Sequence, residues 1–202
     1  MKISLAAFAL IPAICALAVT NGCVFDETSG EAVVKKRVCV LFNESQETGT
    51  FTSSVVCDLF KKRLLEVLDE YDLELSDIER IGVIGGRYKV VKLLGHDWTM
   101  TASVAVSRQD DASGPVTDGP AVLLNMTTQS LRSLKGKPTV ADLNSDGVDL
   151  LNRALNDLLT GADPRIVLTL GDTDVDPVPT AEDPLDFKWL ACVDFQVMMS
   201  TP

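Results

Sequence analysis

The 202-residue chain contains a single histidine, His96, and aromatic residues make up only 5% of it. One histidine is too few for a histidine-based zinc site, and the scarcity of aromatic rings leaves no obvious platform for stacking a sugar. Basic residues are also scarce, since 18 Lys and Arg stand against 29 Asp and Glu, a formal net charge of −11. Nucleic-acid binding requires a basic surface, so we expect no nucleic-acid partner.

The sequence also lacks a recognisable catalytic set. It contains no G-x-S-x-G motif, and a Ser-His-Asp hydrolase would have to be built on His96, which lies beside Asp97 in a predicted turn. None of the five cysteines has a histidine close to it in the sequence, so we expect no thiol catalyst. We therefore predict that the protein is not an enzyme. The alternative is a small exported hydrolase that uses His96 or the acidic loop 172–186.

Residues 1–22 differ in character from the rest of the chain. Lys2 is their only charged residue, and the stretch Ile3–Val19 is almost entirely apolar or small. A positive start, an apolar run and small residues at the end are typical of a secretory signal peptide. A permanent transmembrane helix needs about 20 apolar residues, and this run is short and contains Pro12. We predict export, and cleavage after Ala18 would give a secreted protein.

A second cleavage site is Thr20-Asn21-Gly22-Cys23. It resembles the lipobox of bacterial lipoproteins, in which a small residue, here Gly22, precedes a cysteine that receives a diacylglyceryl group. Thr20 and Asn21 depart from that pattern, which prefers an aliphatic residue and then a small one. The resemblance implies that Cys23 carries lipid and anchors the protein to a membrane, at the bacterial outer membrane, in the periplasm or at the cell surface. The alternative is that Cys23 is a structural cysteine.

Cys39 and Cys57 are predicted to form a disulfide, because export brings the chain into an oxidising compartment. Residues 37–42 and 51–56 have strand-like patterns, and a hairpin at Asn43–Thr50 would place the two cysteines opposite each other. Directly opposite β carbons lie about 4.5–5.5 Å apart, near the spacing that a disulfide requires. The alternative is two buried free thiols.

Helical spacing of apolar residues predicts two helices, at 58–71 and 147–160. We expect Asp58 to cap the start of the first helix. The second is expected to be capped by Ser145 or Asp146 and to end at Gly161. The other segments predict strands or loops. We expect strands at 37–42, 51–56, 78–84, 87–94, 98–107, 121–128, 165–170 and 186–197, and loops at 109–120 and 171–184. A bulge or tight turn is expected at Gly85-Gly86.

Alternating strands without a βαβ rhythm predict a mainly β protein, an antiparallel β-sandwich with two helices. The spacing of strands and loops is similar to that of bacterial surface lipoproteins with immunoglobulin-like sandwiches. The alternative is an α+β antiparallel sheet with both helices on one face. We expect residues 23–34 to be a tether and residues 35–202 to form one β-rich domain.

Two strands have clear inward faces, because their apolar residues recur at every second position. In the strand at 186–197 the second face is mostly polar. The predicted core residues of the two strands are Trp98, Met100, Ala102, Val104 and Val106, and Phe187, Trp189, Ala191, Val193, Phe195 and Val197.

Two acidic motifs are candidates for cation binding. Asp142, Asn144 and Asp146, followed by Gly147, resemble the first half of an EF-hand calcium loop. The twelfth position, where that loop needs an acidic ligand, is Arg153, so we expect helix capping there and no tight calcium site.

The second motif places Asp172, Asp174 and Asp176 at two-residue spacing without a base. We expect a solvated loop, with calcium as a weak alternative, and no obligatory cofactor. The sequence as a whole predicts a non-enzymatic, lipid-anchored envelope protein that acts as a binding or structural module. Its protein or glycan partner is not specified by any motif.

Overall fold

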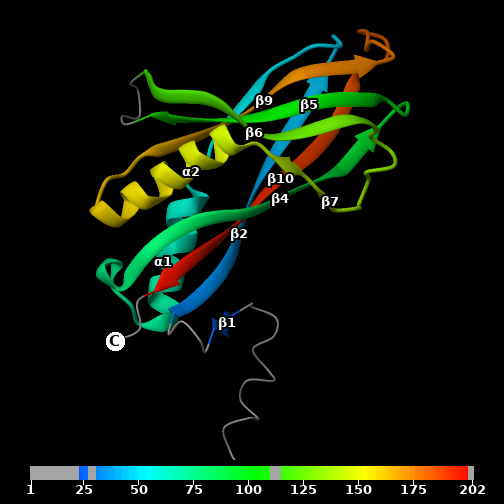
Figure 1. Cartoon of the computed structure of the whole chain (residues 1–202). Coiled ribbons are helices and arrows are strands. Elements are labelled where there is room, and N and C mark those ends of the chain that lie inside the picture. The colour runs from blue at the N-terminus through cyan, green and yellow to red at the C-terminus, as the bar shows by residue number, and fades with distance from the viewer. Residues whose placement is uncertain (1–22, 27–30, 110–114, 200–202) are drawn as a thin grey trace, which may run out of the picture.

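The computed structural model describes residues 23–26, 31–109 and 115–199, and within them ten strands form two antiparallel five-stranded sheets (Figure 1). Sheet A has the order β1 (Cys23–Asp26), β2 (Glu31–Gln46), β10 (Leu185–Met199), β4 (Ile78–Leu94) and β7 (Thr139–Val140). Sheet B has the order β3 (Ser53–Val56), β9 (Arg165–Asp176), β5 (Thr99–Gln109), β6 (Val116–Ser130) and β8 (Asp142–Leu143). The helices are α1 (Leu59–Tyr71) and α2 (Ser145–Asp157), with short 3₁₀ turns at Leu75–Asp77 and Leu158–Thr160.

The predicted antiparallel sandwich with two helices is confirmed. The predicted signal peptide, residues 1–22, lies outside the described residues.

The core lies between the two sheets and is built from the predicted alternating faces. All six predicted core residues of β10 are at most 3% exposed, as are the five from Trp98 to Val106. Trp189 contacts rings on both neighbouring strands, with its centroid 5.8 Å from those of Phe42 and Tyr88. A strand with a period of two buries one whole face at once, so its inward residues can be predicted from the sequence.

Both helices cover the half of sheet A where β2 and β4 begin and β10 ends. Phe60 of α1 packs against Phe195 of β10, with ring centroids 5.8 Å apart. The helix α2 contacts β4, β5 and β6 and buries Leu151 and Leu155. One half of sheet A is therefore covered by the two helices, and the other half is covered by sheet B.

The helix α2 also closes an open edge of sheet A. Asn156 accepts a hydrogen bond from the backbone N–H of Ile81 (3.0 Å) and donates one to the Ile81 carbonyl (2.7 Å). One turn earlier, Asn152 accepts from the N–H of Val83 (2.7 Å). Two amides four residues apart thus satisfy the backbone groups that an adjacent strand would otherwise bind.

A bulge lies directly before Gly85-Gly86, where a bulge or tight turn was expected, and β4 is one continuous strand rather than two. Asp194 pairs with Gly85, whereas the next residue, Phe195, pairs with Val83. Ile84 is the extra residue, and the strand bends there without ending.

Several observed segment boundaries differ from the predicted ones. The strand β9 continues to Asp176, because Thr173 and Val175 alternate inward, so the predicted loop 171–184 is shortened from its start. In the same way β6 already begins at Val116, inside the predicted loop 109–120, of which residues 110–114 lie outside the described part. Residues 23–26 and 31–34 of the predicted tether pair with each other in sheet A.

In the described parts of the chain, no helix is long and apolar enough to cross a membrane.

Candidate binding face on the outer side of sheet A

The outer face of sheet A, the one turned away from sheet B, is unusually basic for a chain with a net charge of −11. The register of the three long strands places side chains in rows across this face, such as Leu41–Leu190–Lys89 and Arg37–Asp194–Gly85. Seven bases and two acids occupy these outward positions of β2, β10 and β4. They are Lys35, Arg37, Arg80, Arg87, Lys89, Lys92 and Lys188, with Asp186 and Asp194. We call this surface the basic face.

A hollow of about 970 Å³ lies at one part of the basic face. Five bases and two acids line it, together with small and aliphatic residues. They are Lys35, Lys36, Arg37, Arg63 and Arg87, with Asp142 and Asp194. Gly85 and Gly86 belong to the same lining, and a Cβ at Gly85 would lie 3.6 Å from a carboxylate oxygen of Asp194. The absence of a side chain at Gly85 therefore helps to keep the hollow open.

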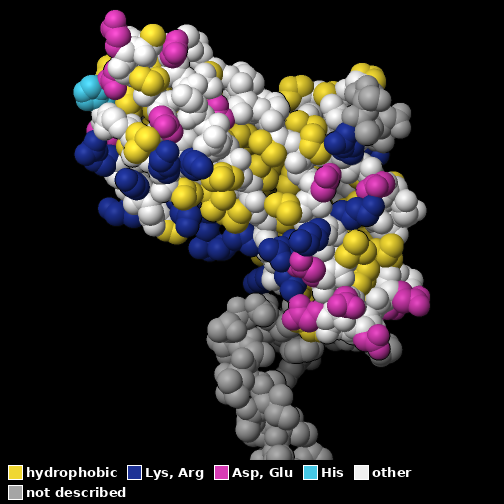
Figure 2. All heavy atoms as spheres, turned by 180° about the vertical axis from the view of Figure 1, so that it is seen from behind, with side chains coloured by type: hydrophobic (Ala, Val, Ile, Leu, Met, Phe, Trp, Pro, Cys, Tyr) yellow, Lys and Arg dark blue, Asp and Glu magenta, His cyan; other side chains and the backbone are white. Residues whose placement is uncertain are grey.

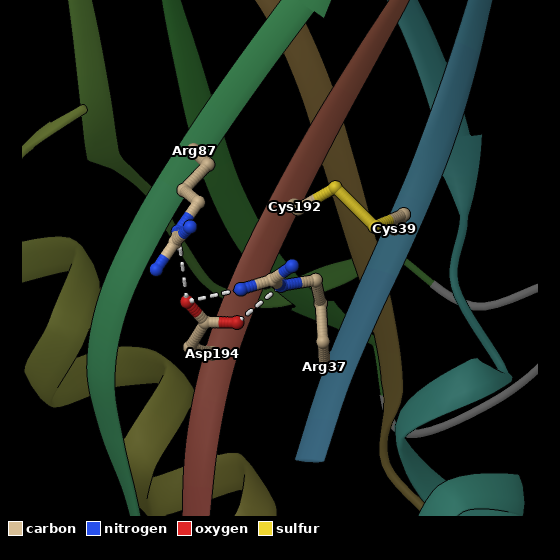
Figure 3. Close-up of a disulfide and its surroundings, with 5 residues drawn as sticks. All are labelled: Arg37, Cys39, Arg87, Cys192 and Asp194. Atoms are coloured by element: carbon tan, nitrogen blue, oxygen red, sulfur yellow. Dashed lines mark hydrogen bonds and ion pairs between the residues drawn. A yellow bond between two sulfur atoms is a disulfide. The ribbon is translucent and has the colours of Figure 1, made fainter. Parts of the chain in front are cut away.

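Asp194 lies between two guanidinium groups in this hollow (Figure 3). Arg37 binds its two carboxylate oxygens through Nε (2.5 Å) and Nη2 (3.2 Å), and Arg87 approaches the second oxygen through Nε at 3.4 Å. The hydrogen bond to Asp194 raises the pKa of Arg37 above its usual value, which burial opposes. The cluster keeps one excess positive charge, and Asp194 on β10 holds the two arginines from the strands on either side of it, β2 and β4.

Other bases of the hollow are partly neutralised by α1. Lys36 binds Glu70 at 2.6 Å, and Arg63 binds Glu66 one turn along the helix. The hydrogen bond from Arg63 lowers the pKa of Glu66. Lys35, in contrast, has no ion-pair partner among the described residues, so its charge is available to a ligand.

A disulfide crosses the basic face beside this cluster, but it joins Cys39 to Cys192 instead of Cys57 (Figure 3). The two cysteines are direct partners in the β2–β10 register, with Cα atoms 4.0 Å apart. The predicted Cys39–Cys57 pair was wrong because β2 and β3 do not form a hairpin: β3 pairs with β9 in the other sheet. The prediction of a disulfide as such is confirmed.

Cys57 is instead a buried free thiol just before α1. Burial raises the pKa of Cys57 to about 11, although backbone hydrogen bonds from Leu59 and Phe60 lower it in part. A thiol with such a pKa is almost fully protonated at neutral pH and is therefore a poor nucleophile.

Apolar side chains are exposed among the bases of the outer surface. Leu41 and Val91 are each 45% exposed, Leu94 is 48% exposed and Val140, at the rim of the hollow, is 74% exposed. Figure 2 shows this combination from behind, with Lys and Arg side chains in a band across the middle of the molecule and apolar side chains beside them. A surface of this kind offers both charge and apolar area to a partner.

The structure does not place the suggested hydrolase residues in a catalytic arrangement. His96 lies in the exposed turn after β4, where its Nδ1 contacts the carboxylate of Asp183 and its ring packs against the edge of Trp98. The neighbouring Asp97 accepts hydrogen bonds from Ser130 and from the backbone of Arg132. Among the residues that the structure describes, neither of these two partners of His96 is a serine or cysteine nucleophile.

Asp172, Asp174 and Asp176 lie on the outer side of β9, each exposed, rather than in a loop. Asp172 accepts a hydrogen bond from the hydroxyl of Ser103 at 2.6 Å. The strand separates the three carboxylates by two residues each, about 6.5 Å along its axis. They do not converge on a single point as calcium ligands do.

Asp142, Asn144 and Asp146 are likewise divided between two elements. Asp142 belongs to β8, whereas Asn144 caps α2 by accepting a hydrogen bond from the backbone N–H of Asp146 (3.0 Å). The helix cap is therefore Asn144 and not the predicted Ser145 or Asp146. Within the described ranges, no group of three or more His, Cys, Asp or Glu residues is arranged to hold a metal ion.

The basic face was not predicted from the sequence. The sequence contains parts of it, Lys35-Lys36-Arg37 on β2 and Arg87 and Lys89 on β4, but these bases lie about 50 residues apart along the chain. The bases of β2 and β4 come to lie on one surface because β10 pairs with both strands. That strand is far from both of them along the chain. A pattern confined to one strand cannot reveal such a surface.

No family model matches the chain, and no curated protein matches it in sequence. Among solved structures, the chain is similar to the structure of infectious bursal disease virus Gt strain, with 13% identity and a TM-score of 0.35 over 85% of this chain and 34% of that one. It is also similar to the structure of desmodium yellow mottle tymovirus, with 9% identity and a TM-score of 0.33 over 83% of this chain and 89% of that one. The chain spans about a third of the length of the first of these. Likenesses at this level assign the chain to no family.

Proposed function

We propose that this protein is a non-enzymatic, exported binding module, anchored by lipid at Cys23 in a bacterial envelope, that holds an anionic partner on the basic face. The observation that carries the proposal is the gathering of seven bases on the outer side of sheet A in a chain whose net charge is −11. The rest of the surface must then be strongly acidic. At physiological salt, charges act over about 8 Å, so a partner at the basic face experiences the local positive charge.

Two further features support binding over a purely structural role. The Arg37–Asp194–Arg87 cluster orients guanidinium groups, which suit carboxylate and phosphate groups through paired hydrogen bonds. The Cys39–Cys192 disulfide ties β2 to β10 beside this cluster, so two of the three strands that carry the bases are held in register. A rigid face loses less entropy when a ligand binds.

Binding can be tested on a phosphate-bearing cation exchanger at pH 7 and low salt. We expect the protein to be retained despite its negative net charge. A triple variant, Lys35→Glu, Lys89→Glu and Lys188→Glu, should elute without retention, because these three bases on the basic face have no ion-pair partner among the described residues.

The matched control changes the same amount of charge elsewhere, with Lys61→Glu, Lys62→Glu and Arg153→Glu on the two helices. This control should elute at only slightly lower salt than the parent. Equal loss of retention in both triple variants would show that net charge alone decides binding, and would overturn the proposal.

Anchoring has its own test. Mass spectrometry of the membrane-extracted protein should find Cys23 as the first residue, carrying lipid, and Cys23→Ser should move the protein to the soluble fraction. A mature chain that begins at Val19 would rule out the anchor and leave the binding face untouched.

A further inference from the structure

We infer that the anionic partner of the basic face is the phospholipid surface of the membrane in which the protein is anchored. This inference rests on the proposed function above. It names one partner among the polyanions that a basic face can hold, and three observations favour it over a soluble one.

The first observation is the position of the anchor residue. In the β1–β2 register, Cys23 is the direct partner of Val34, and Lys35 is the next residue along β2. Adjacent antiparallel strands place such partners about 5 Å apart. A lipid on Cys23 would therefore enter the bilayer beside one end of the basic face, which brings that face close to the headgroups.

The second observation is the mixture of side chains. Leu41 and Val91 are about half exposed on the same strands as the bases, and Val140 is 74% exposed beside the hollow. A soluble polyanion such as an acidic polysaccharide offers nothing to bind these aliphatic groups. The interfacial region of a bilayer accepts them while the bases bind phosphate.

The third observation is the distribution of charge. Anionic headgroups attract bases only within about a Debye length, so a protein of net charge −11 must present its positive side. The outward rows that carry bases run from Asn43–Lys188–Lys92 at one end to Val33–Met198–Arg80 at the other. Ten residues of strand correspond to about 33 Å, long enough to meet several headgroups at once.

The experiment uses the full chain with Cys23→Ser, purified from the host without detergent, so that no lipid contributes to binding. Sedimentation with vesicles of phosphatidylethanolamine and phosphatidylglycerol (7:3) is compared with vesicles of phosphatidylcholine at low salt. We expect binding to the anionic vesicles only, and its loss in high salt.

The triple variant Lys35→Glu, Lys89→Glu and Lys188→Glu should lower partitioning into the anionic vesicles by at least about a hundredfold, since each base near an anionic surface changes partitioning roughly fivefold. The helix control Lys61→Glu, Lys62→Glu and Arg153→Glu should lower it far less. Equal binding to both kinds of vesicle, or equal losses in the two triple variants, would overturn the inference.

The exposed apolar residues allow an experiment that distinguishes a bilayer from a soluble polyanion as the partner. Leu41→Ser with Val91→Ser should weaken vesicle binding several-fold and leave retention on the phosphate exchanger unchanged, because that matrix has no apolar layer. Retention on the exchanger without binding to anionic vesicles would show that the partner is a soluble polyanion. That result would overturn this inference and leave the proposed function standing.

Discussion

Asn156 binds Ile81 as a neighbouring β-strand would, accepting from its N–H and donating to its carbonyl. A helix side chain thus replaces a missing strand at the edge of sheet A. Asn152 extends the same pattern to Val83. The arrangement gives partners to the backbone of Ile81 and to the N–H of Val83 on the side where no strand pairs with the first residues of β4.

Asn156→Ala should therefore destabilise the protein by about 1–3 kcal/mol, because it leaves a donor and an acceptor of Ile81 without partners. Urea unfolding followed by circular dichroism measures the loss. Arg153→Ala, on the exposed side of the same helix, should stay within about 0.5 kcal/mol of the parent. Equal effects would mean that helix propensity, not edge pairing, sets the stability of α2.

Gly147→Ala should be strongly destabilising, although alanine is normally favoured over glycine in a helix by about 1 kcal/mol. A Cβ at Gly147 would lie 2.2 Å from the carbonyl oxygen of Val122 and 2.4 Å from the Cα of Leu123. The helix would have to move away from β6, and overpacking of this kind costs about 1–3 kcal/mol or more. A thermal melt gives the answer directly, and a raised melting temperature would contradict the packing seen here.

The disulfide should map to Cys39 and Cys192, with Cys57 free. Peptide mapping under non-reducing conditions identifies the pair, and Cys57→Ser should leave it intact. Replacing Cys39 and Cys192 by serine should lower stability by about 2–5 kcal/mol, since the bond closes a loop of 153 residues. A Cys39–Cys57 peptide would show that the register of β2 and β10 is wrong.

Because the thiol of Cys57 is buried, we expect the protein to lose stability in alkaline solution. Its pKa rises from 9.0 to about 11 on folding, so the unfolded chain loses the proton first as pH rises. The contribution of the protonated Cys57 thiol to the free energy of unfolding is complete below pH 9 and is lost as the pH rises past 11. The change amounts to up to about 3 kcal/mol. Cys57→Ala should remove this part of the pH dependence when unfolding free energies are compared at pH 8 and pH 11. Parallel curves for parent and variant would refute it.

Trp189→Ala should cost about 3–5 kcal/mol, the usual range for a large aromatic residue removed from a core. Its side chain is fully buried and contacts Phe42 and Tyr88 on the two adjacent strands. Chemical denaturation at neutral pH would measure the loss. Lys188→Ala, the neighbouring residue on the opposite face, is the control and should change stability little.

The parts of the fold that could be predicted are those whose signal lies within one element. The inward face of β10 repeats every second residue, and the apolar stripe of α2 repeats every turn, so both were recognised from the sequence. The C-terminal end of β9 was missed because Asp172, Asp174 and Asp176 look like a loop, although Thr173 and Val175 between them face the core.

Relations between distant segments could not be predicted in the same way. Cys39 had a nearby candidate in Cys57, and nothing in either segment shows that β3 belongs to the other sheet. The partner that it meets, Cys192, is 153 residues away. The basic face depends on the same strand order, and it stayed hidden for the same reason.

The position of β10 between β2 and β4 also has a consequence for how the protein is made. A ribosome completes β2 and β4 long before it reaches residues 185–199, and in the described structure those two strands share no other neighbour. Their inward residues, such as Phe42 and Val90, therefore lack the strand that lies between them while most of the chain already exists. Sheet A can therefore be completed only after its central strand has been synthesised, whereas all five strands of sheet B, the last of which ends at Asp176, exist before that point.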